Sequence, residues 1–380
     1  MQITQPILPS KIYAPAGIAL AKQSVSVDLG VIGLVSLPSG GLGAALSSYG
    51  GMGTPGGAVM YNMGAPSALT GLAAPQDHVI QGMCRCGPYM RRLVVATGKP
   101  GVASTIWISN EAKTAFSVLA SPEDMEVSSG EPLMVQNLAE DRPFAGASAG
   151  QYVYFSALGN HPEGDYALPG HVLVSSGSVT VATMSDLPGN DGRTEGSWVH
   201  SARFAWLGDA LEGGTILRGV PTIATLESHL QIQRSPDVGF TGPYEQVMSV
   251  PTGSEAETAT WTIEAFSGYL GGTNCLLLMG TGVGSASYLY RSTDRGLTWR
   301  PGASFPHSCS YGRGHLHWLN NLEVFLSIGP ILYYSRDGGG TWRKVVNVGD
   351  EVTALTGMAD GSIYAGTQNG VVHRYAPLYW

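Results

Sequence analysis

Short runs of alternating apolar and polar residues recur along the chain, separated by glycine-rich stretches. A period of two is the pattern of strands with one buried face, and the spacing of an amphipathic helix is almost absent. We therefore predict an all-β fold built from many hairpins. The clearest runs are SVSVDL from Ser24, RRLVVATG from Arg91, QYVYFSAL from Gln151, HVLVSSGSVTV from His171 and GSIYAGT from Gly361.

A longer pattern occurs twice near the end of the chain. YLYRSTDRGLTW ends at Trp299 and ILYYSRDGGGTW ends at Trp342, and the two copies are 43 residues apart. A period of about 40 to 50 residues is typical of one four-stranded blade of a β-propeller. Both copies read Ser-x-Asp-x-Gly-x-Thr-Trp, filled by Ser292, Asp294, Gly296, Thr298 and Trp299 in the first and by Ser335, Asp337, Gly339, Thr341 and Trp342 in the second.

Each residue type of this pattern suits a tight turn. The carboxylate can accept backbone N–H groups, the glycine supplies a positive φ, Ser and Thr add side-chain hydrogen bonds, and Trp closes the turn against apolar side chains. We therefore expect Asp294 and Asp337 to lie in turns between outer strands. Their expected role is structural rather than catalytic or metal-binding.

This pattern is the Asp-box, also called the bacterial neuraminidase repeat. On these two copies the chain resembles the sialidase-like propeller superfamily, most specifically in its last third. The resemblance implies a propeller whose boxes lie at the rim, away from the site that binds ligand.

Degenerate copies of the box occur upstream. QIQRSPDVGFTG keeps Ser235, Asp237, Gly239 and Thr241 but has Gly242 in place of Trp. Weaker copies include IWISNEAKTAF, with Ser109 and Phe116 in register, and a shortened last copy, GVVHRYAPLYW. We predict six or seven blades, with box positions near residues 62 (Asn62), 109, 175 (Ser175), 235, 292, 335 and 373.

The beginning of the chain fits no blade. Pro6, Pro9 and Pro15 favour an extended segment. We expect an N-terminal arm over residues 1–23, either packed on a neighbour or frayed, and the propeller over residues 24–380.

Composition narrows the function. The chain has 380 residues, 43% of them apolar, only 13% charged and 53 of them glycine, with a formal charge of -8. Nucleic acid and anionic membranes are unfavourable partners because they need a concentrated cationic face. The sequence has no typical secretion signal and no apolar run long enough to span a membrane. The four cysteines are too few for a disulfide framework, and we expect reduced thiols.

The resemblance implies a test for enzymatic activity. Sialidases hold the substrate carboxylate with three arginines and use a Tyr nucleophile, an activating Glu and an Asp acid/base. The Arg-Ile-Pro signature of the family is absent here. The remaining candidates match no motif, and we interpret them as rim charges rather than a site: Arg85, Arg91, Arg92, Arg203, Arg218, Arg313 and Glu264.

A metal site is also conceivable. HSCSYGRGHLHW places His307 with Cys309, and His315 with His317, on shared strand faces. One hairpin rarely brings four ligands to a tetrahedron, so we predict no metal and no cofactor. Cys84 and Cys86 are interpreted as strand alternation rather than a redox motif.

We therefore expect a non-catalytic propeller that acts as a structural or assembly subunit. Its size and composition resemble those of tail propellers of short-tailed phages, such as nozzle and tail-tip proteins, which implies a virion location, neighbouring subunits as partners and a homo-oligomer. Alternatives are a cellular carbohydrate- or protein-binding Asp-box propeller, in the cytoplasm, and, less favoured, a sialidase-like glycoside hydrolase. A surface polysaccharide remains a candidate ligand. The photosystem assembly factors are disfavoured because the chain lacks an export signal and has few lysines.

Overall fold

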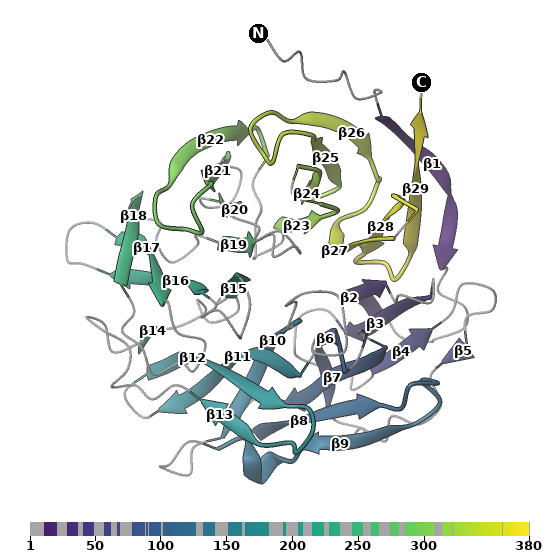
Figure 1. Cartoon of the computed structure of the whole chain (residues 1–380), viewed down its shortest axis with the longest axis vertical. Coiled ribbons are helices and arrows are strands. Elements are labelled where there is room, and N and C mark those ends of the chain that lie inside the picture. The colour runs from purple at the N-terminus through teal and green to yellow at the C-terminus, as the bar shows by residue number, and fades with distance from the viewer. Residues whose placement is uncertain are drawn as a thin grey trace, which may run out of the picture.

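The computed structural model of the chain contains seven antiparallel sheets arranged as the blades of a β-propeller (Figure 1). The sequence prediction of an all-β propeller is confirmed, and the described residues form seven blades. The structure describes residues 11–20, 29–36, 41–48, 57–61, 67–68, 78–87, 89, 91–99, 102–126, 132–140, 151–161, 164–181, 193–194, 204–207, 215–223, 228–235, 245–253, 260–265, 274–280, 286–307, 314–320, 322–358 and 360–379.

Each blade is a meander of four strands, numbered here from the centre of the ring outward. Blade 3 has an additional short strand, β14, that pairs with β12. The strands are β2 (Leu29–Ser36), β3 (Leu42–Ser48), β4 (Gly57–Tyr61) and β5 (Ser67–Ala68) in blade 1; β6 (Val79–Cys86), β7 (Arg92–Lys99), β8 (Val102–Ser109) and β9 (Phe116–Ala120) in blade 2; β10 (Leu133–Glu140), β11 (Tyr152–His161), β12 (Gly164–Leu173), β13 (Val179–Val181) and β14 (Arg193–Thr194) in blade 3; β15 (Phe204–Leu207), β16 (Thr215–Ile223), β17 (Ser228–Ser235) and β18 (Glu245–Gly253) in blade 4; β19 (Thr260–Ala265), β20 (Cys275–Gly280), β21 (Ser287–Ser292) and β22 (Arg300–Phe305) in blade 5; β23 (Gly314–Trp318), β24 (Val324–Ile328), β25 (Ile331–Ser335) and β26 (Arg343–Asn347) in blade 6; and β27 (Val352–Gly357), β28 (Ile363–Thr367) and β29 (Val372–Tyr379) in blade 7.

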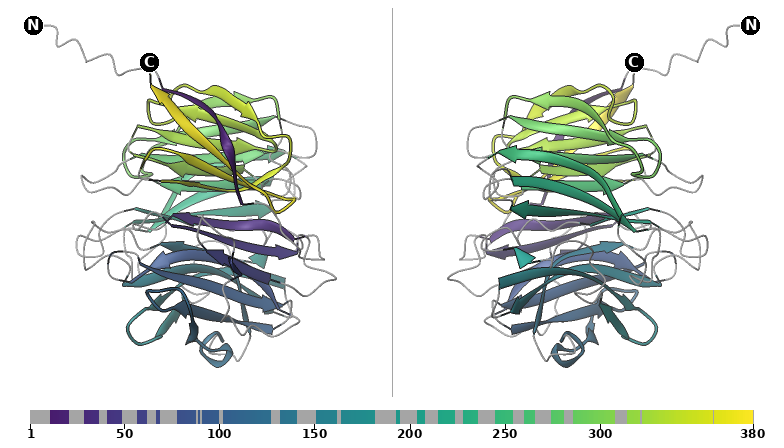
Figure 2. Two further views of the ribbon diagram at one scale, coloured as in Figure 1. Left: turned by 90° about the vertical axis from the view of Figure 1, so that its right-hand side faces the viewer. Right: turned by 90° about the vertical axis from the view of Figure 1, so that its left-hand side faces the viewer.

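The first strands of the blades form the inner ring. Each of β2, β6, β10, β15, β19, β23 and β27 neighbours the next, and β27 neighbours β2. Figure 2 shows the same ring of sheets edge-on, from two opposite sides. Because successive strands are antiparallel, the loops after the first and third strands of every blade open at one end of the ring. The other loops open at the opposite end.

The fourth strand of blade 7 comes from the other terminus. Strand β1 (Lys11–Leu20) pairs antiparallel with β29, from Lys11 opposite Tyr379 to Leu20 opposite Val372 (Figures 1 and 2). Residues 11–20 are therefore part of a blade, and the expectation that residues 1–23 lie outside the propeller is wrong for them. Pro15 is compatible with this position because an outermost strand has one unpaired side. Residues 1–10 and 21–23 lie outside the described residues.

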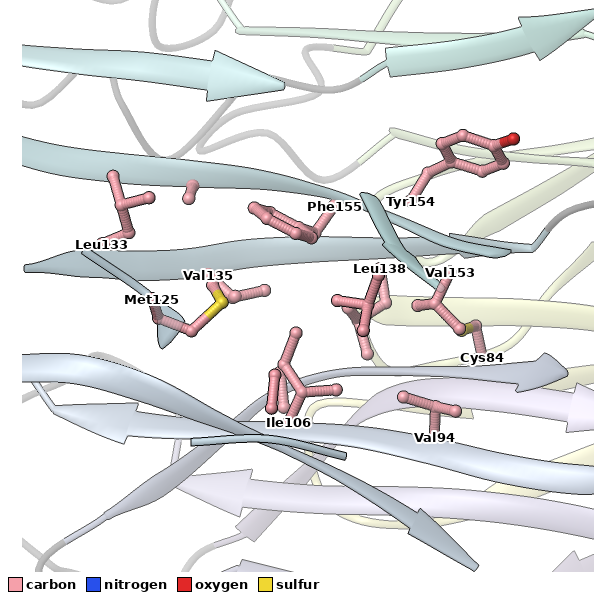
Figure 3. Packing of buried hydrophobic residues seen from close by; sticks show 14 of the residues in the cluster. Cys84, Val94, Ile106, Met125, Leu133, Val135, Leu138, Val153, Tyr154 and Phe155 are labelled. Carbon is pink, nitrogen blue, oxygen red and sulfur yellow. The ribbon is translucent and has the colours of Figure 1, made fainter. Parts of the chain in front are cut away.

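The core consists of apolar clusters between neighbouring blades. One cluster joins Val94 and Ile106 of blade 2 to Val135, Leu138 and Val153 of blade 3, with all five side chains buried (Figure 3). Burial of apolar area is the main favourable term in folding, so each blade is stabilised chiefly by its neighbours. Among the described residues, no helix is long and apolar enough to cross a membrane.

Hydrogen bonds and close backbone packing close the ring between blades 7 and 1. The Thr353 hydroxyl on β27 is within hydrogen-bond distance of the Val31 carbonyl on β2. At Gly30 a Cβ atom would lie only 2.7 Å from the Gln368 carbonyl oxygen. Because the two backbones approach so closely, position 30 has no room for a side chain.

Candidate functional site

The Asp-box of blade 5 forms the turn between β21 and β22. Asp294 Oδ1 accepts the Thr298 backbone N–H at 2.9 Å and the Ser292 hydroxyl at 2.7 Å, and its Oδ2 accepts the Thr298 hydroxyl at 2.5 Å. The Ser292 Oγ also accepts the Gly296 N–H at 2.8 Å, and the Trp299 indole N–H donates to the Gly296 carbonyl at 3.0 Å. The carboxylate thus joins both ends of the turn.

The Asp-box of blade 6, between β25 and β26, repeats this geometry bond for bond. Asp337 Oδ1 accepts the Thr341 N–H and the Ser335 hydroxyl, each at 2.8 Å, and Oδ2 accepts the Thr341 hydroxyl at 2.9 Å. The Gly339 N–H donates to Ser335 Oγ at 2.9 Å, and the Trp342 indole donates to the Gly339 carbonyl at 3.0 Å. The two turns carry different residues at one of the two positions that have a positive φ.

That position follows the aspartate and has a positive φ in both turns. Blade 5 has Arg295 there, at φ 59°, whereas blade 6 has Gly338, at φ 67°. The next residue also has a positive φ, 77° at Gly296 and 89° at Gly339. Two consecutive left-handed residues favour glycine at both positions, so the blade 5 turn contains a strained arginine.

Each box packs on the preceding blade. A Cβ atom at Gly296 would lie 2.6 Å from a methyl group of Leu217 on β16, and one at Gly339 would lie 2.7 Å from Leu276 on β20. Both leucines are fully buried. The box glycine is therefore required twice, by its φ and by contact with the neighbouring blade.

The arginine before the box serine links one box to the next. Arg234, which precedes Ser235 in blade 4, donates from Nε to the Arg295 carbonyl in the blade 5 box at 3.3 Å. Arg291 holds the same place in blade 5. Its Nη1 would lie 3.2 Å from a Cβ atom at Gly340 in the blade 6 box. The boxes are thus part of the contacts between blades 4, 5 and 6.

Both box carboxylates are held ionised by their turns. Burial alone would raise the pKa of Asp294 and of Asp337, but hydrogen bonds within each box hold the pKa below its ordinary value. The donors are the Thr298 and Ser292 groups in blade 5 and the Thr341, Ser335 and Gly340 groups in blade 6. A carboxylate with every oxygen engaged in this way is a poor proton donor near neutral pH.

Comparison with known families and structures agrees with this geometry. The family model of the BNR/Asp-box repeat matches residues 333–344, which contain the blade 6 box. A search of curated proteins found no match. The chain is an Asp-box β-propeller.

Solved structures share the propeller fold with this Asp-box propeller at low identity. "YCF48 bound to D1 peptide" matches with a TM-score of 0.56 and 12% identity over 98% of this chain and 99% of that chain. The WD40 propeller domain of Doa1 matches with a TM-score of 0.55 and 10% identity over 97% of both chains. The extracellular domain of BT4673 from B. thetaiotaomicron matches with a TM-score of 0.56 and 11% identity over 96% of this chain, which spans 40% of that chain.

The eroded box of blade 4 is only partly described. Ser235 is the last residue of β17, so it lies where the box serine lies in blades 5 and 6. Asp237, Gly239 and Thr241 lie outside the described residues. So does Asn62, although it directly follows β4, the third strand of blade 1.

Blade 2 contains a box that the sequence pattern identified only in part. Ser109 ends β8, and Lys113 has a φ of 58° at the place of the box glycine. Asn110 does the work of the aspartate: its Oδ1 accepts the Thr114 N–H and its Nδ2 donates to the Thr114 hydroxyl, both at 2.9 Å. The residue at the aspartate position of the pattern, Glu111, is exposed. The spacing of Asn110 and Thr114, four residues as in Asp294 and Thr298, is the signal that could have identified it.

Two of the remaining box positions need correction. In blade 3 the glycine with the positive φ, Gly177 at 73°, is four residues after Leu173, so Leu173 rather than Ser175 takes the place of the box serine. Residue 373 lies within β29, the third strand of blade 7, and not in a turn. Because β1 supplies the fourth strand of that blade, blade 7 has no chain connection in which a box could form.

Tyr13 of β1 packs where a blade 7 box would pack. Its ring makes edge contacts with Phe325 at 4.7 Å and with Tyr334 at 5.2 Å between ring centroids, both in blade 6. Phe325 pairs with Tyr334, the residue before the box serine, as Leu276 pairs with Arg291 in blade 5. Tyr13 thus covers the blade 6 equivalent of the leucine that a box glycine covers elsewhere.

The residues considered for sialidase chemistry do not form one described cluster. Arg85 on β6 donates to the Ser36 carbonyl on β2 at 2.6 Å, which joins blades 2 and 1. Arg218 is on β16, a second strand, and Glu264 is on the innermost strand β19. Arg203 and Arg313 lie outside the described residues. Arg91 and Arg92 lie in or beside the loop after β6.

The histidine and cysteine residues are also distributed over different elements. His317 Nε2 on β23 accepts the Gly357 N–H on β27 at 2.8 Å, so this nitrogen holds blade 6 to blade 7. His307 is exposed after β22, His315 is half-buried on β23, and Cys309 lies outside the described residues. Cys84, Cys86 and Cys275 are buried thiols, and burial raises the pKa of Cys275. Among the described residues, no three His, Cys, Asp or Glu side chains are placed to hold a metal.

Proposed function

We propose that this Asp-box propeller is a non-catalytic structural or assembly subunit. The observation that supports the proposal most is the use made of its polar side chains. Asp294 and Asp337 close turns, Arg85 joins blades 1 and 2, and His317 joins blades 6 and 7. Groups that are engaged in holding the ring together are poorly available for proton transfer or substrate binding.

We further propose that the assembly is the tail of a phage virion, with the propeller as a nozzle, tail-tip or related component. Charged residues make up only 13% of the chain. Broad neutral faces can be buried against neighbouring subunits at small desolvation cost, and cyclic symmetry lets one such interface close a ring. Neighbouring subunits, a homo-oligomer and a surface polysaccharide remain the proposed partners. Residues 11–20 pack on β29 of their own chain rather than on a neighbouring subunit.

The decisive experiment is to locate the protein in its native particle. Mass spectrometry of purified virions from the native source should detect the chain in a fixed ratio to tail proteins, and particle imaging should place a seven-bladed ring in the tail. Absence of the chain from virions and from every stable complex would overturn the assembly role.

Activity assays test the non-catalytic part independently. The purified protein should not release sialic acid or a fluorogenic leaving group from common glycosides. Turnover that disappears on Glu264→Gln, while the variant keeps the wild-type melting temperature, would replace this proposal with a glycoside hydrolase. A cellular propeller that binds protein or sugar is the remaining alternative, and isolation of the chain with a cellular partner would favour it.

A further inference from the structure

The loop between β6 and β7 contains Tyr89 and Arg91, and Arg92 is the first residue of β7; none of the three has a described contact with another blade. The loop follows a first strand, so it opens at the same end of the ring as the Asp-box turns, which we call the Asp-box end. Tyr89 is 53% exposed and has a φ of 58°. The Arg91 guanidinium carbon lies 5.2 Å from the centre of the Tyr89 ring. A bulky side chain with a positive φ is strained, and such strain is frequent at binding sites.

Neither arginine has an acidic partner among the described residues. Arg91 is exposed, and its recorded contact is the ring of Tyr89. Arg92 is half-buried, and its Nε is buried without a hydrogen-bond partner. Arg374 in blade 7 also has a buried Nε without a partner, but its Nη2 is paired with Asp360 at 3.0 Å. A buried Nε without an acceptor occurs at Arg92, Arg291 and Arg374, and each such donor has lost water without gaining a partner.

A second arginine–tyrosine stack shows what a purely structural pair looks like in this molecule. Arg343 lies 5.1 Å from the ring centre of Tyr334 in blade 6. There the tyrosine is 1% exposed, and its hydroxyl donates to Glu323. The Tyr89 ring is likewise stacked on an arginine, Arg91, but it lies at the surface. The difference between the two stacks is therefore availability to a partner.

The described basic residues are concentrated at the Asp-box end of the ring, where an acidic partner would bind. The Asp-box end contains most of the described basic residues, and several of its carboxylates are engaged in the boxes or with Tyr334 and Arg374. Among the described residues, the loops of the opposite end carry mainly acidic side chains. The basic residues in question are Arg85, Arg91, Arg92, Lys113, Arg295, Arg300, Arg336, Arg343 and Arg374, and the acidic residues of the opposite end are Glu123, Asp124, Glu126, Asp350 and Glu351.

We propose that the Tyr89–Arg92 loop binds the carboxylates of an acidic segment of a partner protein. A guanidinium fork matches a carboxylate in a bidentate arrangement, and tyrosine and arginine are the residue types that dominate protein interfaces. The site is an exposed hairpin loop, whereas sugar and small-molecule sites are concave. The net charge of -8 repels an acidic chain from the rest of the surface and orients its approach to this end. This inference names the chemistry of a partner and rests on the proposed assembly role.

Peptide binding to the purified full chain tests the site. Labelled hexaglutamate should bind in fluorescence anisotropy at low salt, weaken as salt is raised, and bind more tightly than labelled hexaglutamine. Arg91→Gln with Arg92→Gln should weaken hexaglutamate binding about tenfold or more, because each lost charged hydrogen bond is worth about that factor. Arg92→Lys, which keeps the charge but loses the fork, should fall between. The matched control is Arg343→Gln, which removes an exposed arginine stacked on a tyrosine at the same end and should leave binding unchanged.

The other outcomes identify what would be wrong. Equal loss with Arg343→Gln would mean general attraction to the Asp-box end and would overturn the loop as the site. Tighter binding of polygalacturonate than of hexaglutamate, lost in the same double variant, would overturn the assignment to a protein. If the folded wild-type chain does not bind hexaglutamate at low salt, the proposed site is wrong. None of these results bears on whether the chain is found in virions, so the site and the assembly role fail separately.

Discussion

The third-to-fourth strand turns of blade 6 and blade 2 share a side-chain bond to a threonine but differ in residues and in backbone conformation. In blade 6 Asp337 holds Thr341, and Gly338 and Gly339 both have a positive φ, whereas in blade 2 Asn110 holds Thr114 and Lys113 alone has a positive φ. Both turns begin at a buried serine that ends the third strand. The side-chain bond to the threonine is thus retained where the motif is eroded, although part of the backbone geometry is lost. What the blade requires is one side-chain acceptor for the Thr N–H and one left-handed residue.

Substitution of the box glycine in blade 6 should have the largest effect on stability. Gly339→Ala introduces a positive φ in a residue with a Cβ atom and places that atom 2.7 Å from Leu276. We expect a loss of about 2 to 4 kcal/mol of unfolding free energy, measured by denaturant titration. The control is Gly349→Ala, which has a similar φ of 91° but no atom within 4 Å of the added Cβ. Equal losses in both variants would mean that contact with the preceding blade contributes nothing.

Replacement of the Asp337 carboxylate should have the second-largest effect on stability. Asp337→Ala removes the acceptor of the Thr341 N–H and should cost about 1 to 3 kcal/mol. Asp337→Asn keeps Oδ1, and the Thr341 hydroxyl can turn to accept from the new amide as Thr114 does in blade 2, so its loss should be smaller. If both variants lose the same stability, the equivalence of the two turns is wrong.

The stability that the Asp337 carboxylate contributes should depend on pH. Because the folded pKa of Asp337 is below its ordinary value, the carboxylate adds stability above about pH 4. That contribution is lost as pH falls through the lowered folded pKa. The stability difference between wild type and Asp337→Asn should therefore shrink on acidification. A difference that stays constant from neutral pH to pH 2 would show that the carboxylate charge is not involved.

Replacing the strained arginine should be stabilising. Arg295 in blade 5 has the positive φ that Gly338 has in blade 6. Arg295→Gly relieves left-handed strain, at the cost of a more flexible unfolded chain, and should raise the unfolding free energy by ~0.5 to 1 kcal/mol. The carbonyl that Arg234 uses stays in place. Thermal unfolding of this variant beside Arg300→Gly, a nearby arginine in strand β22, separates backbone relief from loss of charge.

The sequence predicted the parts of this fold that depend on local signals. The apolar run from Leu93 to Val95 and the spacing of Ser292 and Ser335 are local, and they indicated strands and blades correctly. The pairing of Lys11 with Tyr379 joins the two ends of the chain, and no short-range pattern reports it. Likewise Tyr13 gives no sign in the sequence that it covers Phe325 and Tyr334.

Erosion of the repeat limited the prediction of the turns. In blade 2 the aspartate position of the pattern holds Glu111, but the bonds move to Asn110, one residue earlier. An amide oxygen accepts from a backbone N–H as a carboxylate does, although less strongly, so the bond survives a change that the pattern does not tolerate. The Tyr89 loop follows no repeat at all, because residues that face a partner are not constrained by contacts between blades.

Restoring the aspartate in blade 2 should have the smallest effect. In Asn110→Asp the Oδ1 atom still accepts the Thr114 N–H, and the Thr114 hydroxyl can donate to the second carboxylate oxygen as Thr298 does in blade 5. The change adds a charge beside Glu111 but keeps every bond, so the unfolding free energy near neutral pH should change by less than about 0.5 kcal/mol. The new carboxylate should make blade 2 weakly acid-sensitive, as Asp337 makes blade 6. Asn110→Ala, which removes the acceptor, should cost more than Asn110→Asp in the same titration. Equal effects of the two substitutions would mean that Asn110 is not the blade 2 counterpart of Asp337.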